Sequence, residues 1–245
     1  NSFIDRPDVR TSFGMIKLVK QFHLNNQMPK FSTNKLTKMI DKIDNWIEEA
    51  EEKGEVAVDT ETSSLDPHQA DLIGLSLSSK IGKACYIPIG HDPKKSLDKG
   101  LVLKKLKSIL EDTIIKKVGQ NIKYDVIIFK NENIELSPID DTMLLSYTLD
   151  AGNNRHNMDT LSELHLSHKT ISYKDLVGTG KKQLNFADVD IKPATEYAAE
   201  DADITLRLYE VLSERVSKEK LERVYEEFEK QMIKIISRLE MKGII

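Results

Sequence analysis

The order in which helical and strand-like segments follow one another restricts the fold of this chain more than any other feature. Three short apolar runs with strand character come close together, at residues 55–60, 72–78 and 84–89, and turn-forming residues separate them. Helical and strand-like segments then alternate, and the C-terminal half is mainly helical. We therefore predict an α/β domain with a mixed β-sheet flanked by helices.

The expected helices have the apolar period of about 3.6 residues that is typical of amphipathic helices. The first would be capped by Ser32 or Thr33 and would end at Gly54. A further short strand is expected at residues 114–118, and residues 167–191 are expected to form a loop. The other helices are expected at residues 101–111, 121–131, 141–149, 159–166, 193–213 and 218–241.

Composition excludes several kinds of site. Cys85 is the only cysteine, so the chain can form neither an internal disulfide nor a thiolate zinc site, and a cytoplasmic location is expected. No run of about 18 apolar residues is present, so no membrane span is expected. The net charge of −4 argues against nucleic-acid binding unless bound cations neutralise carboxylates at the contact point.

The first predicted strand ends in two acidic residues that share one face. Side chains alternate along a strand, so Ala57, Asp59 and Glu61 lie on one face, while Val56 and Val58 lie on the other. Two carboxylates in this position repel each other unless they share a proton or a metal ion. The alternative is a solvated strand end that enters a loop.

A second polar cluster lies at the start of the helix predicted for residues 121–131. Asn121 and Asp125 are four residues apart, so a helix would place both on one face. The alternative interpretation makes Asn121 a helix N-cap and Asp125 an exposed acid in the first turn.

A third cluster lies on the helix predicted for residues 193–213. Tyr197 and Asp201 are also four residues apart, so the phenol and the carboxylate point the same way. Glu200 and Asp203 fall on other faces of this helix, where we expect them to be solvated or capping charges.

Taken together, the three clusters are more specific than any one of them. Carboxylate oxygens are the ligands that Mg²⁺ and Mn²⁺ prefer. Four carboxylates can neutralise two divalent cations, and a pair of such ions can promote an in-line displacement at a phosphate. The sequence therefore predicts a two-metal site formed by Asp59, Glu61, Asp125 and Asp201.

Longer segments around these residues resemble a known family. They read DTET at residues 59–62, VGQNIKYD at residues 118–125, RHNMD at residues 155–159 and YAAEDAD at residues 197–203. These segments resemble the proofreading 3′→5′ exonuclease domains of bacterial DNA polymerase I, within the DEDD exonuclease superfamily. Tyr197 marks the tyrosine branch, since Glu196 stands where the other branch has histidine.

The resemblance implies a ribonuclease H-like sheet and a role for each matching residue. Asp59, Glu61 and Asp201 would bind the first of two Mg²⁺ ions directly, with Mn²⁺ as a substitute. Asp59 would also hold the second ion, with Asp125 acting mainly through its water. Tyr197 would orient the attacking water together with Glu61.

The resemblance also implies contacts to a DNA strand. Leu65 would wedge against the terminal bases, and Phe186 would pack on a base or a sugar, although ordinary packing is an alternative for both. The sugar-phosphate strand would be held by Gln120, Asn121, Tyr124 and Arg155.

The activity that the resemblance implies is hydrolysis of single-stranded or frayed DNA 3′ ends to 5′-mononucleotides. An RNase D-like exoribonuclease and a catalytically silent domain of a polymerase are the alternatives. We expect residues 1–31 to be a linker or an N-terminal extension and residues 32–216 to be the exonuclease domain. Residues 217–245 are expected to form a helix that leads into a covalently linked polymerase domain.

Overall fold

A computed structural model describes residues 39–244, and its centre is a five-stranded sheet. The strands are β1 (Glu55–Thr62), β2 (Leu72–Lys80), β3 (Lys83–Pro88), β4 (Lys116–Gly119) and β5 (Ile139–Asp141). Their order in the sheet is β3-β2-β1-β4-β5. The first three strands pair antiparallel, and β4 pairs parallel with both β1 and β5. The predicted mixed sheet is confirmed.

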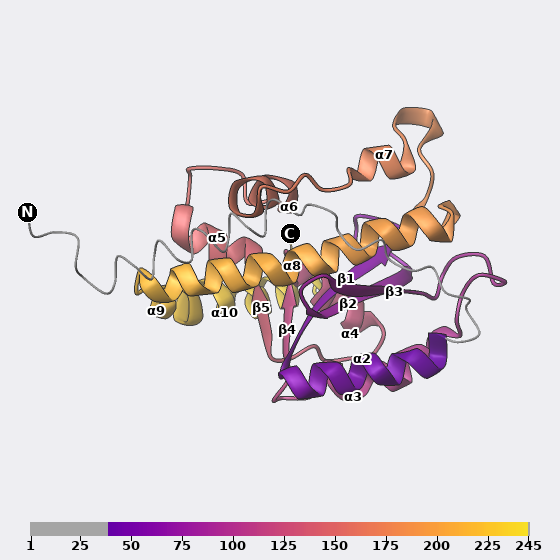
Figure 1. The fold of residues 1–245 in the computed structure, drawn as a ribbon, viewed down its shortest axis with the longest axis horizontal. Helices are drawn as coiled ribbons and strands as arrows, with labels where there is room; N and C mark the ends of the chain where they lie inside the picture. Colours follow the sequence, from indigo (N-terminus) through magenta and orange to yellow (C-terminus); the bar gives the residue numbers. More distant parts are fainter. Residues whose placement is uncertain (1–38, 245) are drawn as a thin grey trace, which may run out of the picture. The chain divides into compact units, whose positions relative to one another are not determined.

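Six helices of eight or more residues flank this sheet in the described part of the chain (Figure 1). They are α2 (Met39–Lys53), α3 (Lys99–Leu110), α4 (Lys123–Asn131), α5 (Thr142–Asp150), α8 (Ile191–Lys218) and α10 (Lys230–Glu240). Short helical turns make up most of the remaining connections. They are α6 (Met158–Leu161), η2 (Ser162–Leu166), α7 (Tyr173–Val177), η3 (Gly180–Lys182), η4 (Phe186–Asp188), α9 (Glu222–Val224) and η5 (Tyr225–Glu229).

Most element predictions hold, including the end of the first helix at Gly54, whereas strand β5 was not predicted and two other segments differ. The first helix ends before Gly54, whose φ of +69° is a left-handed conformation that glycine adopts without strain, while its predicted caps lie outside the described residues. The helix expected from residue 121 begins only at Lys123, because Asn121 has a φ of +57°. The loop expected at residues 167–191 contains α7, η3 and η4.

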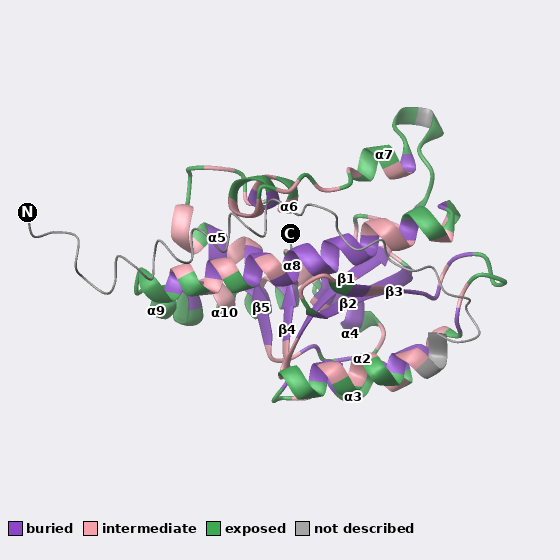
Figure 2. Ribbon diagram, in the orientation of Figure 1, coloured by how far each residue is buried: buried purple, intermediate pink, exposed green. Residues whose placement is uncertain are grey.

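Helices cover both faces of the sheet and form a three-layer arrangement. Val56 and Val58 of β1 belong to a core that includes Ile43 of α2, Leu106 of α3 and Phe129 of α4. On the other face, Val118 of β4 packs with residues of α5 and α8. Figure 2 shows α8 as the helix with the longest buried stretch, where it crosses the sheet. This helix therefore brings residues far along the chain onto β1.

The C-terminal segment, residues 222–240, packs against the sheet and the helices described above. Ile233 of α10 is buried in the core shared by the sheet, α2, α3 and α4. Lys123 Nζ of α4 forms an ion pair with Glu240 at 2.5 Å. Among the residues that the structure describes, none of the helices combines the length and the apolar character that crossing a bilayer requires.

Candidate metal centre

Strand β1 carries the first two acids of the site next to small residues of the neighbouring strand. Asp59 lies opposite Ser76 and Glu61 lies opposite Gly74 in the antiparallel pairing of β1 with β2. A Cβ at Gly74 would lie 2.1 Å from the hydroxyl oxygen of Tyr86. Only glycine therefore leaves room for the Tyr86 ring at this place beside Glu61.

Helix α8 brings the third acid to the first two. Carboxylate oxygens of Asp59, Glu61 and Asp201 lie within 4.8 Å of one another. The close approach of helix and sheet depends on small side chains, because Ala199 and Ala202 are fully buried and pack together with Ala84 of β3. Three acids that are far apart in the sequence therefore share one small volume.

Asp125 of α4 completes the set of acids but is held separately. Its Oδ1 accepts hydrogen bonds from the Thr60 amide over 3.0 Å and from the Thr60 hydroxyl over 2.5 Å. The charge of Asp59 raises the pKa of Asp125, after the larger effect of burial, so the two carboxylates are electrostatic neighbours. Asp125 therefore lies beside the group of three acids, with an oxygen already engaged by the protein.

The four carboxylates destabilise one another's charged forms when no cation is present. Burial raises the pKa of Asp59, Glu61 and Asp125 well above their ordinary values, and neighbouring carboxylates raise these pKa values further. Burial also raises the pKa of Asp201 to about 8, although the hydrogen bond from Tyr197 opposes this effect.

The arrangement fits divalent cations. Oε1 of Glu61 is buried and accepts no hydrogen bond, which is costly for a carboxylate oxygen that has no cation partner. Oxygen-only donors of net negative charge suit Mg²⁺ and Mn²⁺. Asp59, Glu61 and Asp201 are therefore the residues that can hold such an ion, with Asp125 beside them.

Tyr197 stands one helical turn before Asp201 and hydrogen-bonds to it. Burial and the nearby carboxylates raise the pKa of this phenol, so it is protonated at neutral pH. Its ring lies 5.9 Å from the ring of Tyr173 and 6.2 Å from that of Phe186, measured between centroids. Aromatic neighbours therefore fix the direction of the phenol.

The residues that were predicted to contact a DNA strand occupy different environments. The side chain of Leu65, in the loop after β1, is 94% exposed, and Asn121 and Arg155 are also exposed. The amide of Gln120 is used within the protein, since Nε2 donates to the His156 carbonyl over 2.8 Å and Oε1 accepts from Thr142.

The Tyr124 hydroxyl is likewise engaged within the protein. It hydrogen-bonds to the Thr62 hydroxyl and the Ser64 carbonyl, each over 2.5 Å. The polar groups of the Tyr124 and Gln120 side chains are therefore used within the protein, while Leu65, Asn121 and Arg155 are exposed.

Phe186 does not offer its ring to a ligand in this structure. The side chain is 1% exposed and packs in a core with Ile73, Val177 and Ala198. A base contact would require the ring to leave this core, so the packing alternative is the one that the structure favours. Its place next to Tyr197 makes it a support of the site.

Tyr173 is a residue that sequence reasoning missed. It is 38% exposed, its ring lies against Tyr197, and the charge of Glu61 contributes to its raised pKa after the effect of burial. The residue begins α7, inside the stretch that was expected to be a loop, where nothing in the sequence distinguishes its position from that of Phe186.

The expectation for Glu200 and Asp203 was wrong, because both are buried and paired. Glu200 accepts hydrogen bonds from the Ile171 amide over 2.6 Å and pairs with His168 over 2.9 Å. Asp203 accepts from the Gly82 amide over 2.6 Å and pairs with Arg207 at 2.8 Å. These contacts tie α8 to two loops and stabilise the placement of Asp201 between them.

Known proteins resemble this chain over most of its length. The sequence profile of a 3′-5′ exonuclease family matches residues 36–217. DNA polymerase I of Rhizobium leguminosarum is 45% identical over 223 residues, which cover 82% of this chain and 22% of that protein. The chain thus spans about a fifth of the length of the curated relatives that it matches.

Solved structures share the fold. NrnC of Brucella melitensis superposes with a TM-score of 0.64 and 23% identity over 82% of this chain and 89% of that one, and NrnC has also been solved with bound Mg²⁺. RNase D of Escherichia coli superposes with a TM-score of 0.61 and 18% identity over 80% of this chain and 48% of that one. These likenesses show that the fold is ribonuclease H-like.

Proposed function

Since the chain belongs to the 3′-5′ exonuclease domain family of DNA polymerase I, we propose that it hydrolyses single-stranded or frayed DNA from the 3′ end and releases 5′-mononucleotides. The observation that carries this proposal is the gathering of Asp59, Glu61 and Asp201 within 4.8 Å, with Asp125 and Tyr197 beside them. Glu61, Asp125 and Asp201 are buried and Asp59 is half-buried, and carboxylates this close repel one another unless they share protons or cations.

The acids of the site would hold two Mg²⁺ ions, and Mn²⁺ would substitute. Asp59, Glu61 and Asp201 have the donor atoms for one ion, and Asp59 together with Asp125 has those for the other. Two such ions, when bound, supply Lewis acidity to the scissile phosphate and to the leaving 3′ oxygen. The unpaired Oε1 of Glu61 supports this assignment.

Tyr197 and Glu61 would orient the attacking water. The raised pKa of Tyr197 keeps its hydroxyl protonated, so it can donate one hydrogen bond and accept another. The contact with Asp201 fixes the hydroxyl next to the acids. Orientation of a nucleophile in this way lowers the barrier without a covalent step.

A strand of DNA would enter past the exposed residues of the site. Leu65 would press against the terminal bases, Tyr173 would stack on a base, and Asn121 and Arg155 would contact the sugar-phosphate backbone. A terminal phosphodiester reaches buried acids only if its bases leave the duplex, which favours single strands and frayed mispaired ends. This preference links the site to proofreading.

The relatives of the chain support a proposal for its wider setting. We propose that residues 32–216 are the exonuclease domain and that residues 217–245 lead into a covalently linked polymerase domain, since the relatives carry the name DNA polymerase I and are several times longer. A cytoplasmic location with access to chromosomal DNA fits that role.

The names of the curated relatives favour DNA over RNA as the substrate. The fold alone does not distinguish the two substrates, because RNase D shares it. The test is a 5′-labelled DNA oligonucleotide and an RNA of the same sequence, each incubated with Mg²⁺ or with a chelator. We expect a ladder that shortens from the 3′ end on DNA, only with the metal. Shortening of RNA alone would establish the RNase D-like alternative.

Variants separate the site from the rest of the protein. Asp201→Ala is expected to abolish shortening while the fold is kept, whereas Glu51→Ala, an exposed acid on α2, is expected to change nothing. Wild-type protein that shortens neither substrate and binds no Mn²⁺ would establish the alternative of a catalytically silent domain.

A further inference from the structure

The C-terminal segment is joined to strand β5 through a buried acid. Asp140 is 3% exposed, and its carboxylate accepts hydrogen bonds from Tyr225 over 3.1 Å and from Tyr209 over 3.0 Å. Lys230 and Lys116 lie 2.7 and 3.1 Å from its oxygens. Tyr225 and Lys230 both belong to the C-terminal segment, so two of the four partners come from there.

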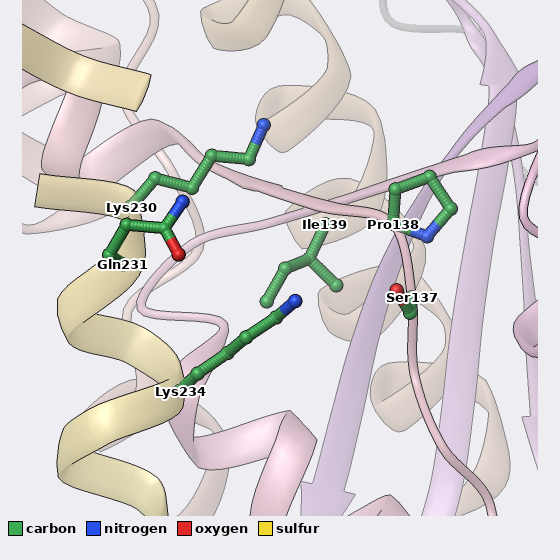
Figure 3. A pocket seen from close by; sticks show the side chains of 6 residues that line it. All are labelled: Ser137, Pro138, Ile139, Lys230, Gln231 and Lys234. Atoms are coloured by element: carbon green, nitrogen blue, oxygen red, sulfur yellow. The ribbon is translucent and has the colours of Figure 1, made fainter. Parts of the chain in front are cut away.

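Helix α10 lies directly against this part of the sheet. Figure 3 shows three of its side chains turned toward the chain at the start of β5. Together they enclose a small hollow that is lined by Ser137, Pro138, Ile139, Lys230, Gln231 and Lys234.

The hydroxyl of Tyr225 also reaches the next residue of β5. It accepts a hydrogen bond from the Asp141 amide over 2.9 Å while it donates to Asp140. The carboxylate of Asp141 is 1% exposed and accepts from the amides of Asn121 and Ile122, each over 3.0 Å. Asp141 is therefore the single residue that connects Tyr225 to the turn before α4.

Hydrogen bonds to Asp141 hold that turn. Asn121 has a φ of +57°, a left-handed conformation that asparagine adopts more readily than other residues with a Cβ but less readily than glycine. The two hydrogen bonds to Asp141 hold it in this conformation. By contrast, Asp125 further along α4 is fixed independently by its two hydrogen bonds from Thr60.

We propose that Tyr225 is a positioning residue for the DNA-binding turn, residues 119–122, and that it acts through Asp141. The inference rests on the proposed function, because the turn carries Asn121, which is assigned there to the DNA backbone. The C-terminal segment, residues 222–240, thereby contributes to substrate binding. The effect falls on binding rather than on turnover, because Asp125 keeps its own support.

The test compares two identical substitutions. Tyr225→Phe removes the hydroxyl that contacts both Asp140 and Asp141, whereas Tyr209→Phe removes a hydroxyl that contacts Asp140 but not Asp141. We expect Tyr225→Phe to raise KM for a DNA oligonucleotide about threefold to tenfold, the equivalent of one hydrogen bond, with kcat within about twofold. Tyr209→Phe is expected to leave both constants unchanged.

A second measurement needs no activity. Amide hydrogen exchange without DNA should show faster exchange at residues 121 and 122 in Tyr225→Phe than in Tyr209→Phe, at a temperature well below unfolding of either variant. Because this readout is independent of catalysis, it distinguishes a failed proposal from an inactive enzyme. Equal exchange at the turn in the two variants, or equal changes in KM, overturns the proposal.

A variant at the other end of the C-terminal segment keeps the proposal testable if the Tyr225→Phe protein does not fold. Glu240→Gln removes the ion pair with Lys123, which joins α10 directly to the first turn of α4. We expect a smaller rise in KM, about twofold, and faster exchange of the Tyr124 amide, which donates to the Asn121 carbonyl over 3.1 Å. Unchanged exchange there overturns the link between the segment and α4.

Discussion

The amide and the hydroxyl of Thr60 both donate to Oδ1 of Asp125, over 3.0 and 2.5 Å. Thr60 lies between Asp59 and Glu61 in the chain, so this contact joins helix α4 to the strand that carries two of the acids. Thr60 does not itself supply a carboxylate to the site.

Thr60→Val keeps the shape of the side chain and removes the hydroxyl. A hydrogen bond to a charged group contributes about 1.5–3 kcal/mol, so we expect kcat/KM on a DNA oligonucleotide to fall about tenfold to a hundredfold. Thr148→Val is the matched control, because the Thr148 hydroxyl donates only to a backbone carbonyl of its own helix. Equal activities of the two variants would contradict the prediction.

Tyr173 and Phe186 are predicted to give opposite results. Tyr173→Ala should raise KM about fivefold to a hundredfold, since stacking on a base contributes about 1–3 kcal/mol, and should leave the melting temperature nearly unchanged. Phe186→Ala should lower the free energy of unfolding by about 3–5 kcal/mol, because it empties a core position.

The discriminating variant is Phe186→Leu, which refills most of that core. If Phe186 acts by packing, this variant regains most of the stability and binds DNA with a KM close to that of the wild type. A KM as high as that of Tyr173→Ala, in a protein that melts like the wild type, would instead support a base contact by Phe186.

Much of the fold could be predicted from local patterns. The apolar runs of β1, β2 and β3 and the amphipathic period of α3 and α8 identify these elements, because burial of one face is a local property of the sequence. Strand β5 could not be predicted, since it is three residues long and two of them are the acids Asp140 and Asp141. Their burial depends on partners distant in the sequence.

The site shows the same division. Spacing along β1 and α8 indicates which acids share a face, but it does not show that acids on different elements lie within 4.8 Å of one another. The left-handed turn at Asn121 depends on Asp141, so the helix start was placed two residues early. Tyr173 and Phe186 are both aromatic residues in one irregular stretch, and only tertiary packing separates the exposed ring from the buried one.

A buried lysine on β4 supplies a prediction for stability alone. Nζ of Lys117 donates to the carbonyls of Asp112 over 2.7 Å, of Ile115 over 2.6 Å and of Ser137. Lys117→Met should lower the free energy of unfolding by at least about 1–3 kcal/mol, because these buried acceptors lose their donor. Denaturant unfolding measures the change, and Lys104→Met, on an exposed position of α3, is the control that should have no effect.

We predict that the stability of the metal-free protein falls as the pH rises, whereas the stabilising effect of a bound metal ion grows. Burial raises the pKa of Asp201 from its ordinary value of 3.8 to about 8, so the metal-free folded state binds more protons than the unfolded state between these values. The stability that this group contributes is therefore complete below about pH 4 and is lost as the pH rises through 8.

Mn²⁺ binds the deprotonated acids, so its stabilising effect should be larger at pH 8 than at pH 6. Melting temperatures at both pH values, with and without Mn²⁺, test this, and Asp201→Asn should flatten both dependences. A metal-free protein that melts higher at pH 8 than at pH 6, with no response to Mn²⁺, would contradict the assignment of a cation site to these acids.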